Sequence, residues 1–418
     1  MRIRTVTVTP VAFPDPALLN SAGVHQPWAL RAIVQLDCGD GLTGLGETYG
    51  DAAHLALLRT VAPLLVGLDP FHTNELTRRI TEALGAADAP DRHGLTGGTG
   101  PEKTALKVLS PFEVACLDLQ GRITGRPVAD LLGGRVRDEV PYSAYLFYKW
   151  AGHPGAAEDD WGPALDPDGI VAQARRMVDR YGFGSLKLKG GVFPPELEIE
   201  AIRALRAAFP EHPLRLDPNA AWTVDTSRAV AAGTEGLLEY LEDPTPGIPG
   251  MAEVARDAPM PLATNMCVVA PADLAPGFGA GAVGVVLADH HYWGGLRRSA
   301  ELAAICRTWG VGVSMHSNSH LGISLAAMTH LGAALPELSY AADTHTPWQL
   351  GTDVVAEPLP IVDGAVRVPE GPGLGVELDP DALARLHEDY LRCGIRERDD
   401  TAYRQQFEPD FRRRRPRW

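Results

Sequence analysis

Closely spaced cysteine pairs, a positive net charge and long apolar runs are all missing from this 418-residue sequence. The formal net charge of −15 argues against nucleic acid or an anionic membrane surface as a partner. No segment is long and apolar enough to span a bilayer, and the first residues lack the apolar core of a signal peptide. The five scattered cysteines favour reduced thiols, so we expect a cytoplasmic protein: Cys38, Cys116, Cys267, Cys306 and Cys393.

The first 135 or so residues predict a small α+β domain. Strand patterns come first, at residues 4–13, 30–38 and 41–50, and helical patterns follow around 51–66, 70–84 and 111–123. A glycine-rich loop at 93–104 precedes the last of these helices. A run of strands followed by a run of helices is typical of α+β domains.

From about residue 136 to residue 355, short apolar strands alternate with helical stretches. This rhythm predicts a parallel α/β barrel. An open doubly wound sheet is the alternative, but the glycine-rich phosphate turn expected after its first strand is missing. Residues 356–418 predict a loop and one helix that pack back on the first domain, and the basic end FRRRRPRW predicts a solvated tail. The eight expected barrel strands lie at 140–146, 185–191, 214–219, 238–244, 261–266, 284–290, 312–318 and 338–345.

Almost every expected barrel strand ends in a polar or charged side chain. The carboxyl ends of parallel barrel strands meet at one mouth, where barrel enzymes carry their chemistry. Helix capping would account for any one of these residues, but eight consecutive strand ends indicate a site. In chain order the residues are Tyr145, Lys187, Lys189, Asp217, Asn219, Glu242, Asp243, Asn265, Asp289, His316, Asn318, Asp343 and His345.

Three oxygen-bearing side chains end successive strands and predict a metal site. Asp217, Glu242 and Asn265 each present an oxygen, with no thiolate or imidazole among them. Oxygen donors of this kind suit a hard divalent cation, and Mg²⁺ is the ion that leaves positions open for substrate.

Asp289 and His316 end the sixth and seventh strands and predict a carboxylate–histidine pair. A carboxylate can hold a histidine in one tautomer and raise its basicity, which would make a general base. The alternative is a core histidine bonded to a backbone carbonyl. His290, His291, His316 and His320 raise a zinc site as a further alternative, but their spacing matches no familiar zinc pattern.

The stretch SLKLKGG predicts a strand with two faces. Residues two apart point the same way in a strand, so Leu186 and Leu188 face the helices while Lys187 and Lys189 face the barrel interior. Two buried ammonium groups need anionic partners. Mutual repulsion beside a metal favours a neutral amine in one of them, which could act as a base, while the other lysine stays cationic.

The motifs SLKLKGG, LDPN, LEDP, ATNM, LADHHYW and MHSNSH resemble the enolase superfamily, and more narrowly its glucarate dehydratase group. The resemblance implies a modified (β/α)7β TIM barrel with an α+β N-terminal capping domain completed by the C-terminal segment. It divides the chain at 1–135, 136–355 and 356–418.

The resemblance also implies residue roles. Asp217, Glu242 and Asn265 would bind Mg²⁺, Lys189 would be the base on one face of the substrate, and His316, oriented by Asp289, the base on the other. Lys187 would stabilise the enolate, and Asn318 would join the catalytic set. The implied substrate contacts are His25, Thr99, Tyr145, Lys187, Asn219, Ser317, Asn318, His345 and Arg398.

The implied activity is magnesium-dependent dehydration of D-glucarate to 5-keto-4-deoxyglucarate, with a small acid-sugar dicarboxylate as partner and a homo-oligomer as the assembly. Other aldaric or aldonic acids such as galactarate, racemisation or epimerisation on the same scaffold, and a non-catalytic metabolite-binding paralogue are the alternatives. Two departures bear on the substrate. The run after Ser317 reads Asn-Ser-His-Leu-Gly where the family tends to have Asn-Asn-His-Phe-Asp, and Thr346 stands where members often have Trp.

Overall fold

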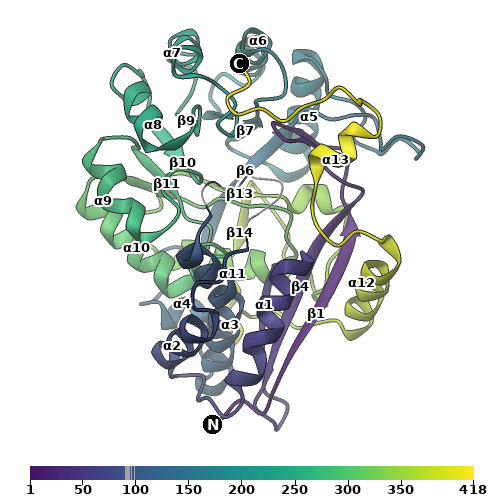
Figure 1. The fold of residues 1–418 in the computed structure, drawn as a ribbon, viewed down its shortest axis with the longest axis vertical. Helices are drawn as coiled ribbons and strands as arrows, with labels where there is room; N and C mark the ends of the chain where they lie inside the picture. The colour runs from purple at the N-terminus through teal and green to yellow at the C-terminus, as the bar shows by residue number, and fades with distance from the viewer. Residues whose placement is uncertain (90–94, 96, 98) are drawn as a thin grey trace.

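The computed structural model describes residues 1–89, 95, 97 and 99–418. An antiparallel sheet with its helices forms one end of the molecule and a parallel barrel forms the other (Figure 1). The expected glycine-rich loop at 93–104 lies partly outside the described residues.

The antiparallel sheet has the strand order β1-β4-β5 and is built by the first 50 residues. Its strands are β1 (Thr5–Pro14), β4 (Trp28–Asp37) and β5 (Thr43–Tyr49). A two-stranded hairpin, β2 (Leu19–Asn20) with β3 (Gly23–Val24), lies between β1 and β4 in sequence. We call this sheet, with the helices up to residue 131, the cap.

The helices of the cap follow the sheet, as the sequence predicts. Helix α2 shows why they form, because Leu76, Ile80 and Leu84 recur at helical spacing and are its buried face. Helix α3 packs on β5 and β4 and is buried along most of its length, because it lies between the sheet and the barrel. The helices are α1 (Ala52–Val61), the 3₁₀ turn η1 (Ala62–Leu65), α2 (Thr73–Leu84), α3 (Pro101–Thr124) and α4 (Val128–Leu131).

Eight parallel strands form the barrel, and all eight coincide with segments that the sequence predicts. They are hydrogen-bonded in the order β12-β11-β10-β9-β8-β7-β6-β13. The seam between β12 and β13 carries a backbone bond from Asp343 N to Met315 O of 2.9 Å, so the barrel is nearly closed. The strands are β6 (Glu139–Phe147), β7 (Leu186–Lys189), β8 (Leu214–Asp217), β9 (Tyr240–Glu242), β10 (Leu262–Thr264), β11 (Val285–Leu287), β12 (Gly312–Ser314) and β13 (Ala342–Thr344).

One helix follows each of the first seven barrel strands, which gives the (β/α)7β arrangement in this fully described part of the chain. Helices α7, α8 and α9 do not stand out individually in the sequence, because α8 and α9 are rich in glycine and proline and α7 is short. The helices are α5 (Pro167–Tyr181), α6 (Pro195–Ala208), α7 (Val224–Gly233), α8 (Gly247–Ala255), α9 (Pro271–Gly279), α10 (Leu296–Thr308) and α11 (Gly322–Ala334).

The C-terminal segment returns to the cap. After the turn η2 (Thr346–Gln349), strand β14 (Ala365–Arg367) pairs antiparallel with β6. Helix α12 (Pro380–Cys393) packs on β1, and α13 (Asp400–Gln405) contacts β3. Only part of the tail is solvated. Arg412 and Arg414 are exposed, but the end of the chain is tied to the barrel by bonds from Thr223 N to Trp418 O (2.7 Å) and from Trp418 N to Ala221 O (3.0 Å).

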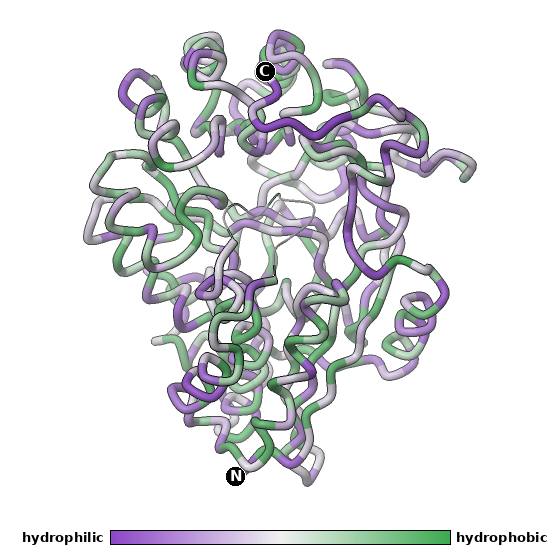
Figure 2. Tube along the Cα trace, viewed as in Figure 1, coloured by the Kyte–Doolittle hydropathy of each residue, from purple (hydrophilic) through white to green (hydrophobic). Residues whose placement is uncertain are grey.

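A continuous apolar core joins the cap to the barrel. Val11 and Leu45 of the cap sheet, Leu117 of α3 and Leu186 of β7 belong to one cluster of buried side chains. Figure 2 shows apolar segments along the inner strands and helices, whereas the stretch that leads to the C-terminus is hydrophilic. This shared core fixes the cap against the barrel. No helix in the described ranges is long and apolar enough to cross a membrane.

Candidate active site

The structure places the predicted polar residues at the carboxyl ends of the barrel strands. Lys187 and Lys189 lie in β7, and Asp217 and Glu242 are the last residues of β8 and β9. The others follow their strands directly or by two residues: Asn265 after β10, Asp289 after β11, His316 after β12 and His345 after β13. All of these side chains are buried. The alternation of β7 holds as predicted, since both lysine side chains reach interior carboxylates.

Lys187 lies among three carboxylates. Its Nζ is 2.6 Å from Glu242 Oε2, 2.6 Å from Asp343 Oδ2 and 3.5 Å from Asp217 Oδ2. Burial by itself would lower the pKa of Lys187, but Asp343 and Glu242 outweigh burial and raise it well above its ordinary value. Lys187 is therefore a permanent cation that holds this carboxylate cluster together.

Among the described residues Lys189 has one carboxylate partner, Asp217, and its electrostatic environment differs from that of Lys187. Its Nζ lies 2.6 Å from Asp217 Oδ2 and donates to Tyr145 Oη at 3.0 Å. Burial lowers the pKa of Lys189, and the attraction of Asp217 does not fully offset burial and the repulsion of Lys187. The sequence prediction of one cationic lysine beside one that loses its proton more readily agrees with this asymmetry.

The environment of Asp217, Glu242 and Asn265 fits a divalent cation. Burial and the neighbouring charge of Asp217 raise the pKa of Glu242 well above its usual range. Neither Glu242 Oε1 nor Asn265 Oδ1, both buried, accepts a hydrogen bond from any residue that the structure describes. Buried oxygen atoms without a hydrogen-bond donor need another partner, and Mg²⁺ binds oxygen ligands of this kind.

Asp243, one of the predicted strand-end residues, and Thr264, which the sequence did not single out, hold the third oxygen donor, Asn265, in place. Asp243 accepts hydrogen bonds from Asn265 N at 2.8 Å and from Thr264 Oγ1 at 2.5 Å. Asp243 and Asn219 have φ angles of +35° and +49°, which residues other than glycine seldom adopt. Strain of this kind gathers at functional sites. In the sequence, Asp243 directly follows Glu242 in LEDP, and this adjacency is the signal that places Asp243 near the metal ligands.

His316 and Asp289 form the expected pair. His316 Nδ1 lies 3.0 Å from Asp289 Oδ2. Burial would raise the pKa of Asp289, but His291 and His316 hold it well below its usual value. An ionised carboxylate only accepts, so His316 Nδ1 carries the proton and Nε2 is left as the basic nitrogen.

A cavity joins the two proposed bases, since both Lys189 and His316 line it. Three predicted substrate contacts do not belong to the lining: Thr99, which is exposed, and Lys187 and Asn219, which are buried beside Asp217. Six of the predicted substrate contacts do belong to it: His25, Tyr145, Ser317, Asn318, His345 and Arg398.

Two of the predicted lining residues come from outside the barrel, and Asn20 and Leu95, which were not predicted, come from the cap as well. His25 of the cap is buried with its Nδ1 3.0 Å from Asp15 Oδ2. Arg398 of the C-terminal segment donates to Asn318 Oδ1 at 3.1 Å and is held by Asp400 at 2.8 Å. Taken alone in sequence, both would be read as surface residues. The fold brings them over the barrel mouth.

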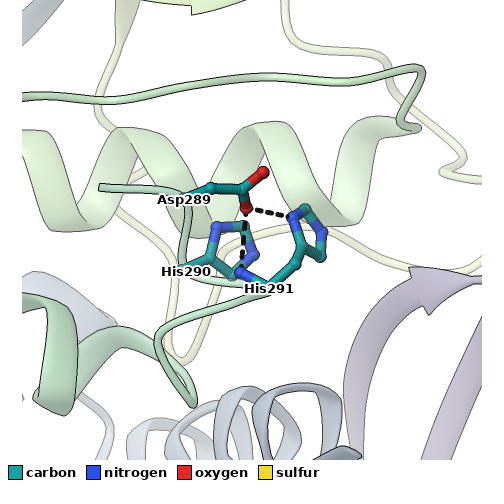
Figure 3. A group of neighbouring side chains, drawn as sticks. All are labelled: Asp289, His290 and His291. Carbon is teal, nitrogen blue, oxygen red and sulfur yellow. Dashed lines mark hydrogen bonds and ion pairs between the residues drawn. The ribbon is translucent and has the colours of Figure 1, made fainter. Parts of the chain in front are cut away.

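Asp289, His290 and His291 form a compact group (Figure 3). His291 Nδ1 contacts Asp289 Oδ1 at 2.7 Å, and its Nε2 contacts Arg31 Nη2 at 2.8 Å. His320 contacts Leu321 O and Thr344 Oγ1. The rings of His291 and His320 thus already have protein partners, and a guanidinium beside His291 repels a cation, so the zinc alternative loses its support.

Comparisons with known families match nearly the whole chain. The family model "Enolase C-terminal domain-like" matches residues 169–382, and the model "Mandelate racemase / muconate lactonizing enzyme, N-terminal domain" matches residues 3–133. A Streptomyces coelicolor protein named a probable glucarate dehydratase is 54% identical, over 98% of this chain and 97% of its own. The D-galactarolactone cycloisomerase of Agrobacterium fabrum is 28% identical, over 88% of this chain and 94% of its own.

Solved structures are similar over the full length. An enolase from Thermobispora bispora, complexed with magnesium and formate, is 65% identical with a TM-score of 0.99 and covers 100% of both chains. An enolase from Pseudomonas fluorescens Pf0-1, with bound magnesium, potassium and tartrate, is 50% identical with a TM-score of 0.96 and covers 100% of this chain and 99% of its own.

Proposed function

The chain belongs to the enolase superfamily, and from this we propose that it is a magnesium-dependent hydro-lyase that dehydrates acid sugars, with D-glucarate as substrate. One observation carries the proposal. His316 and Lys189 line the same cavity, and Lys189 forms an ion pair with Asp217, one of the three proposed metal ligands. Such a site can remove a proton next to a carboxylate that is held by a cation.

We propose that Asp217, Glu242 and Asn265 hold Mg²⁺. When bound, the ion would supply positive charge against the substrate carboxylate and so lower the energy of the enolate. The donor-free oxygens of Glu242 and Asn265 support this assignment, as does the magnesium in the Thermobispora bispora structure.

The reaction begins with proton removal by His316. Its Nε2 takes the proton from the carbon next to the carboxylate, while Asp289 stabilises the imidazolium that forms. The hydroxyl on the next carbon then leaves as water, and His316 returns the proton to it. The enol that remains becomes 5-keto-4-deoxyglucarate. Lys187, a cation throughout, stabilises the negative charge that develops.

The cavity suits a dianionic substrate although the chain carries a net charge of −15. Arg398 is a cation at the cavity wall, and Tyr145, His25, His345, Ser317 and Asn318 add polar contacts around it. We propose that these residues bind the far carboxylate and the hydroxyl groups. We also keep Thr99, Lys187 and Asn219 as proposed substrate contacts, although they lie outside the cavity lining.

A second candidate reaction on this scaffold is the epimerisation of an acid sugar, which one observation favours. Lys189, whose pKa is lowered by burial, shares the cavity with His316. Two bases in one cavity would permit epimerisation of an acid sugar that lacks a positioned leaving group, and dehydration of galactarate would use the same residues. A non-catalytic paralogue is the weaker alternative, because the ligands and both bases are complete.

Three further parts of the proposal concern the whole chain. The boundaries are 1–135 for the cap domain, 136–355 for the barrel and 356–418 for the segment that completes the cap. The protein is cytoplasmic, in keeping with five free thiols. The assembly is a homo-oligomer.

The experiment that tests the function is a substrate panel. The protein with Mg²⁺ is incubated with aldaric and aldonic acids, and the keto-deoxy product is measured. We expect product from D-glucarate. Turnover of none of the acid sugars would overturn the dehydratase proposal, and an epimer without keto-deoxy product would move the function to the epimerase alternative.

A further inference from the structure

In the described part of the chain Asp289 contacts two histidines, His291 and His316, and the proposed reaction uses only His316. Its Oδ2 faces His316 Nδ1 at 3.0 Å. Its Oδ1 accepts from His291 N at 2.9 Å and contacts His291 Nδ1 at 2.7 Å. The carboxylate is therefore held from one side by His291 so that its other side faces His316 (Figure 3 shows the His291 contact).

The proton position on His291 is fixed by Arg31 of the cap. Arg31 Nη2 lies 2.8 Å from His291 Nε2. A guanidinium only donates, so Nε2 must accept and the single ring proton must be on Nδ1. His291 is therefore neutral and donates its Nδ1 proton to Asp289.

Arg31 is itself anchored deep in the molecule. Its Nε donates to Glu47 Oε1 at 2.8 Å, and both side chains are buried. Glu47 also accepts from Leu321 N at 2.8 Å and from Ser324 N at 2.9 Å, at the start of the helix that follows the His316 loop. A buried ion pair with its remaining oxygen bonds satisfied keeps one geometry.

We propose that His291 is a positioning residue for the base His316, and that Arg31 on the cap fixes the tautomer in which His291 can do so. The proposal rests on the proposed function of His316 and adds to it a chain of contacts from Glu47 through Arg31, His291 and Asp289. The cap thereby takes part in orienting the base, in addition to covering the barrel.

Loss of the His291 donor has a predictable electrostatic effect. In the wild-type protein the negative charge of Asp289 interacts with both His291 and His316. Without the Nδ1 donor, the carboxylate interacts more strongly with the His316 imidazolium, so His316 titrates at higher pH. At neutral pH a smaller fraction of His316 is then free to accept a proton. Among the described residues, the other titratable or charged groups around these two rings are Lys189, Tyr145, His25, His345, Arg398, Arg31, Glu47, Tyr49, His290 and His320.

Two isosteric variants separate the two contacts of His291. His291→Asn retains an amide donor where Nδ1 stands and loses the Arg31 contact. His291→Gln retains an oxygen for Arg31 and loses the donor to Asp289. Ser324→Ala is the matched control, because Ser324 Oγ contacts His291 Nε2 at 2.9 Å and Arg31 Nη2 at 3.3 Å but does not hydrogen-bond to Asp289.

The measurement is the titration of the His316 ring in ¹⁵N-histidine-labelled protein, assigned with His316→Asn, together with the pH–rate profile for D-glucarate. In His291→Gln we expect the ring midpoint and the acid limb of the profile to move together to higher pH, with roughly a tenfold loss of rate at neutral pH. In His291→Asn and in Ser324→Ala, the ring midpoint and the acid limb of the profile should stay near their wild-type positions.

The outcomes distinguish this proposal from the proposed function. A His291→Gln protein with an unmoved ring midpoint overturns the positioning role, even where the rate falls, because a purely structural role would lower yield without changing the titration. A moved ring midpoint supports the role whether or not any acid sugar is dehydrated, since it is read from the protein alone.

Discussion

Lys189 Nζ lies 2.6 Å from Asp217 Oδ2, and this contact joins a proposed base to a proposed metal ligand. The lysine is on β7 and the aspartate ends β8, and the two residues are direct partners in the parallel register. Adjacent strands therefore set the distance between the two groups, without any contribution from loops. A site built on strands in this way is rigid.

Lys189→Met should distinguish the role of Lys189 from the role of His316. Because Lys189 serves the face opposite to His316, the variant should lose reaction of the C5 epimer of D-glucarate by a factor of about 100 or more. It should keep measurable dehydration of D-glucarate itself. The keto-deoxy product assay with both substrates checks this. Equal losses on both substrates would show that Lys189 acts on Asp217 and not on the substrate.

Lys187→Met should destabilise the protein. Its removal leaves Glu242 and Asp343 buried without their 2.6 Å cationic partner, which costs about 3 kcal/mol of unfolding free energy. Urea unfolding in metal-free buffer measures this cost. Lys189→Met is the matched control and should lose less stability, since Lys189 pairs with one carboxylate, Asp217, in the described part of the chain. The assignment of Lys187 as the cluster's cation fails if the two variants are equally stable.

Glu242→Gln should weaken Mg²⁺ binding at least tenfold, because it removes a charge from a set of three oxygen donors. Isothermal titration calorimetry with Mg²⁺ alone provides the readout, independent of catalysis. Glu253→Gln, on the exposed side of α8, is the control and should bind as the wild type does. Unchanged affinity in Glu242→Gln would place the cation elsewhere.

Stability should fall in mild acid because of His330. Burial lowers the pKa of His330 to about 4, and the ring accepts from Ala129 N and donates to Leu374 O. The unfolded chain takes up this proton near pH 6.5 while the folded chain does not, so stability is complete above about 6.5 and declines toward pH 4. The loss from this one group amounts to about 2 kcal/mol at pH 5.

Urea unfolding between pH 7 and pH 5 tests whether the free energy of unfolding falls as the pH falls. His330→Gln removes the titrating group and should flatten the dependence by that amount. The variant keeps an amide that can bond to the same backbone groups. A variant with the full wild-type dependence would mean that His330 is already protonated in the folded protein or that other histidines dominate.

The barrel and the line of strand ends could be predicted because both are local patterns. Alternation along SLKLKGG assigns the faces of β7, and Asp217, Glu242 and Asn265 follow apolar strands at the positions where a parallel barrel opens. The short helices α8 and α9 could not be predicted individually, since their glycine and proline content obscures helical periodicity.

The contributions of the cap could not be derived from local patterns. Arg31 lies in a cap strand 260 residues before His291, and Arg398 reaches Asn318 from the C-terminal segment. No spacing rule connects residues so far apart, because only the shared core brings the cap over the barrel. Thr99 lies next to residues that the structure does not describe, and its predicted substrate contact remains a prediction.

The most direct test of the account is the reaction of D-glucarate with Mg²⁺ in D₂O, followed by NMR for wild type and His316→Asn. We expect the wild type to form 5-keto-4-deoxyglucarate, and we expect His316→Asn, folded as judged by circular dichroism, to form none at a detectable rate. A His316→Asn protein that dehydrates D-glucarate at near the wild-type rate would contradict the assignment of His316 as the base on which the mechanism depends.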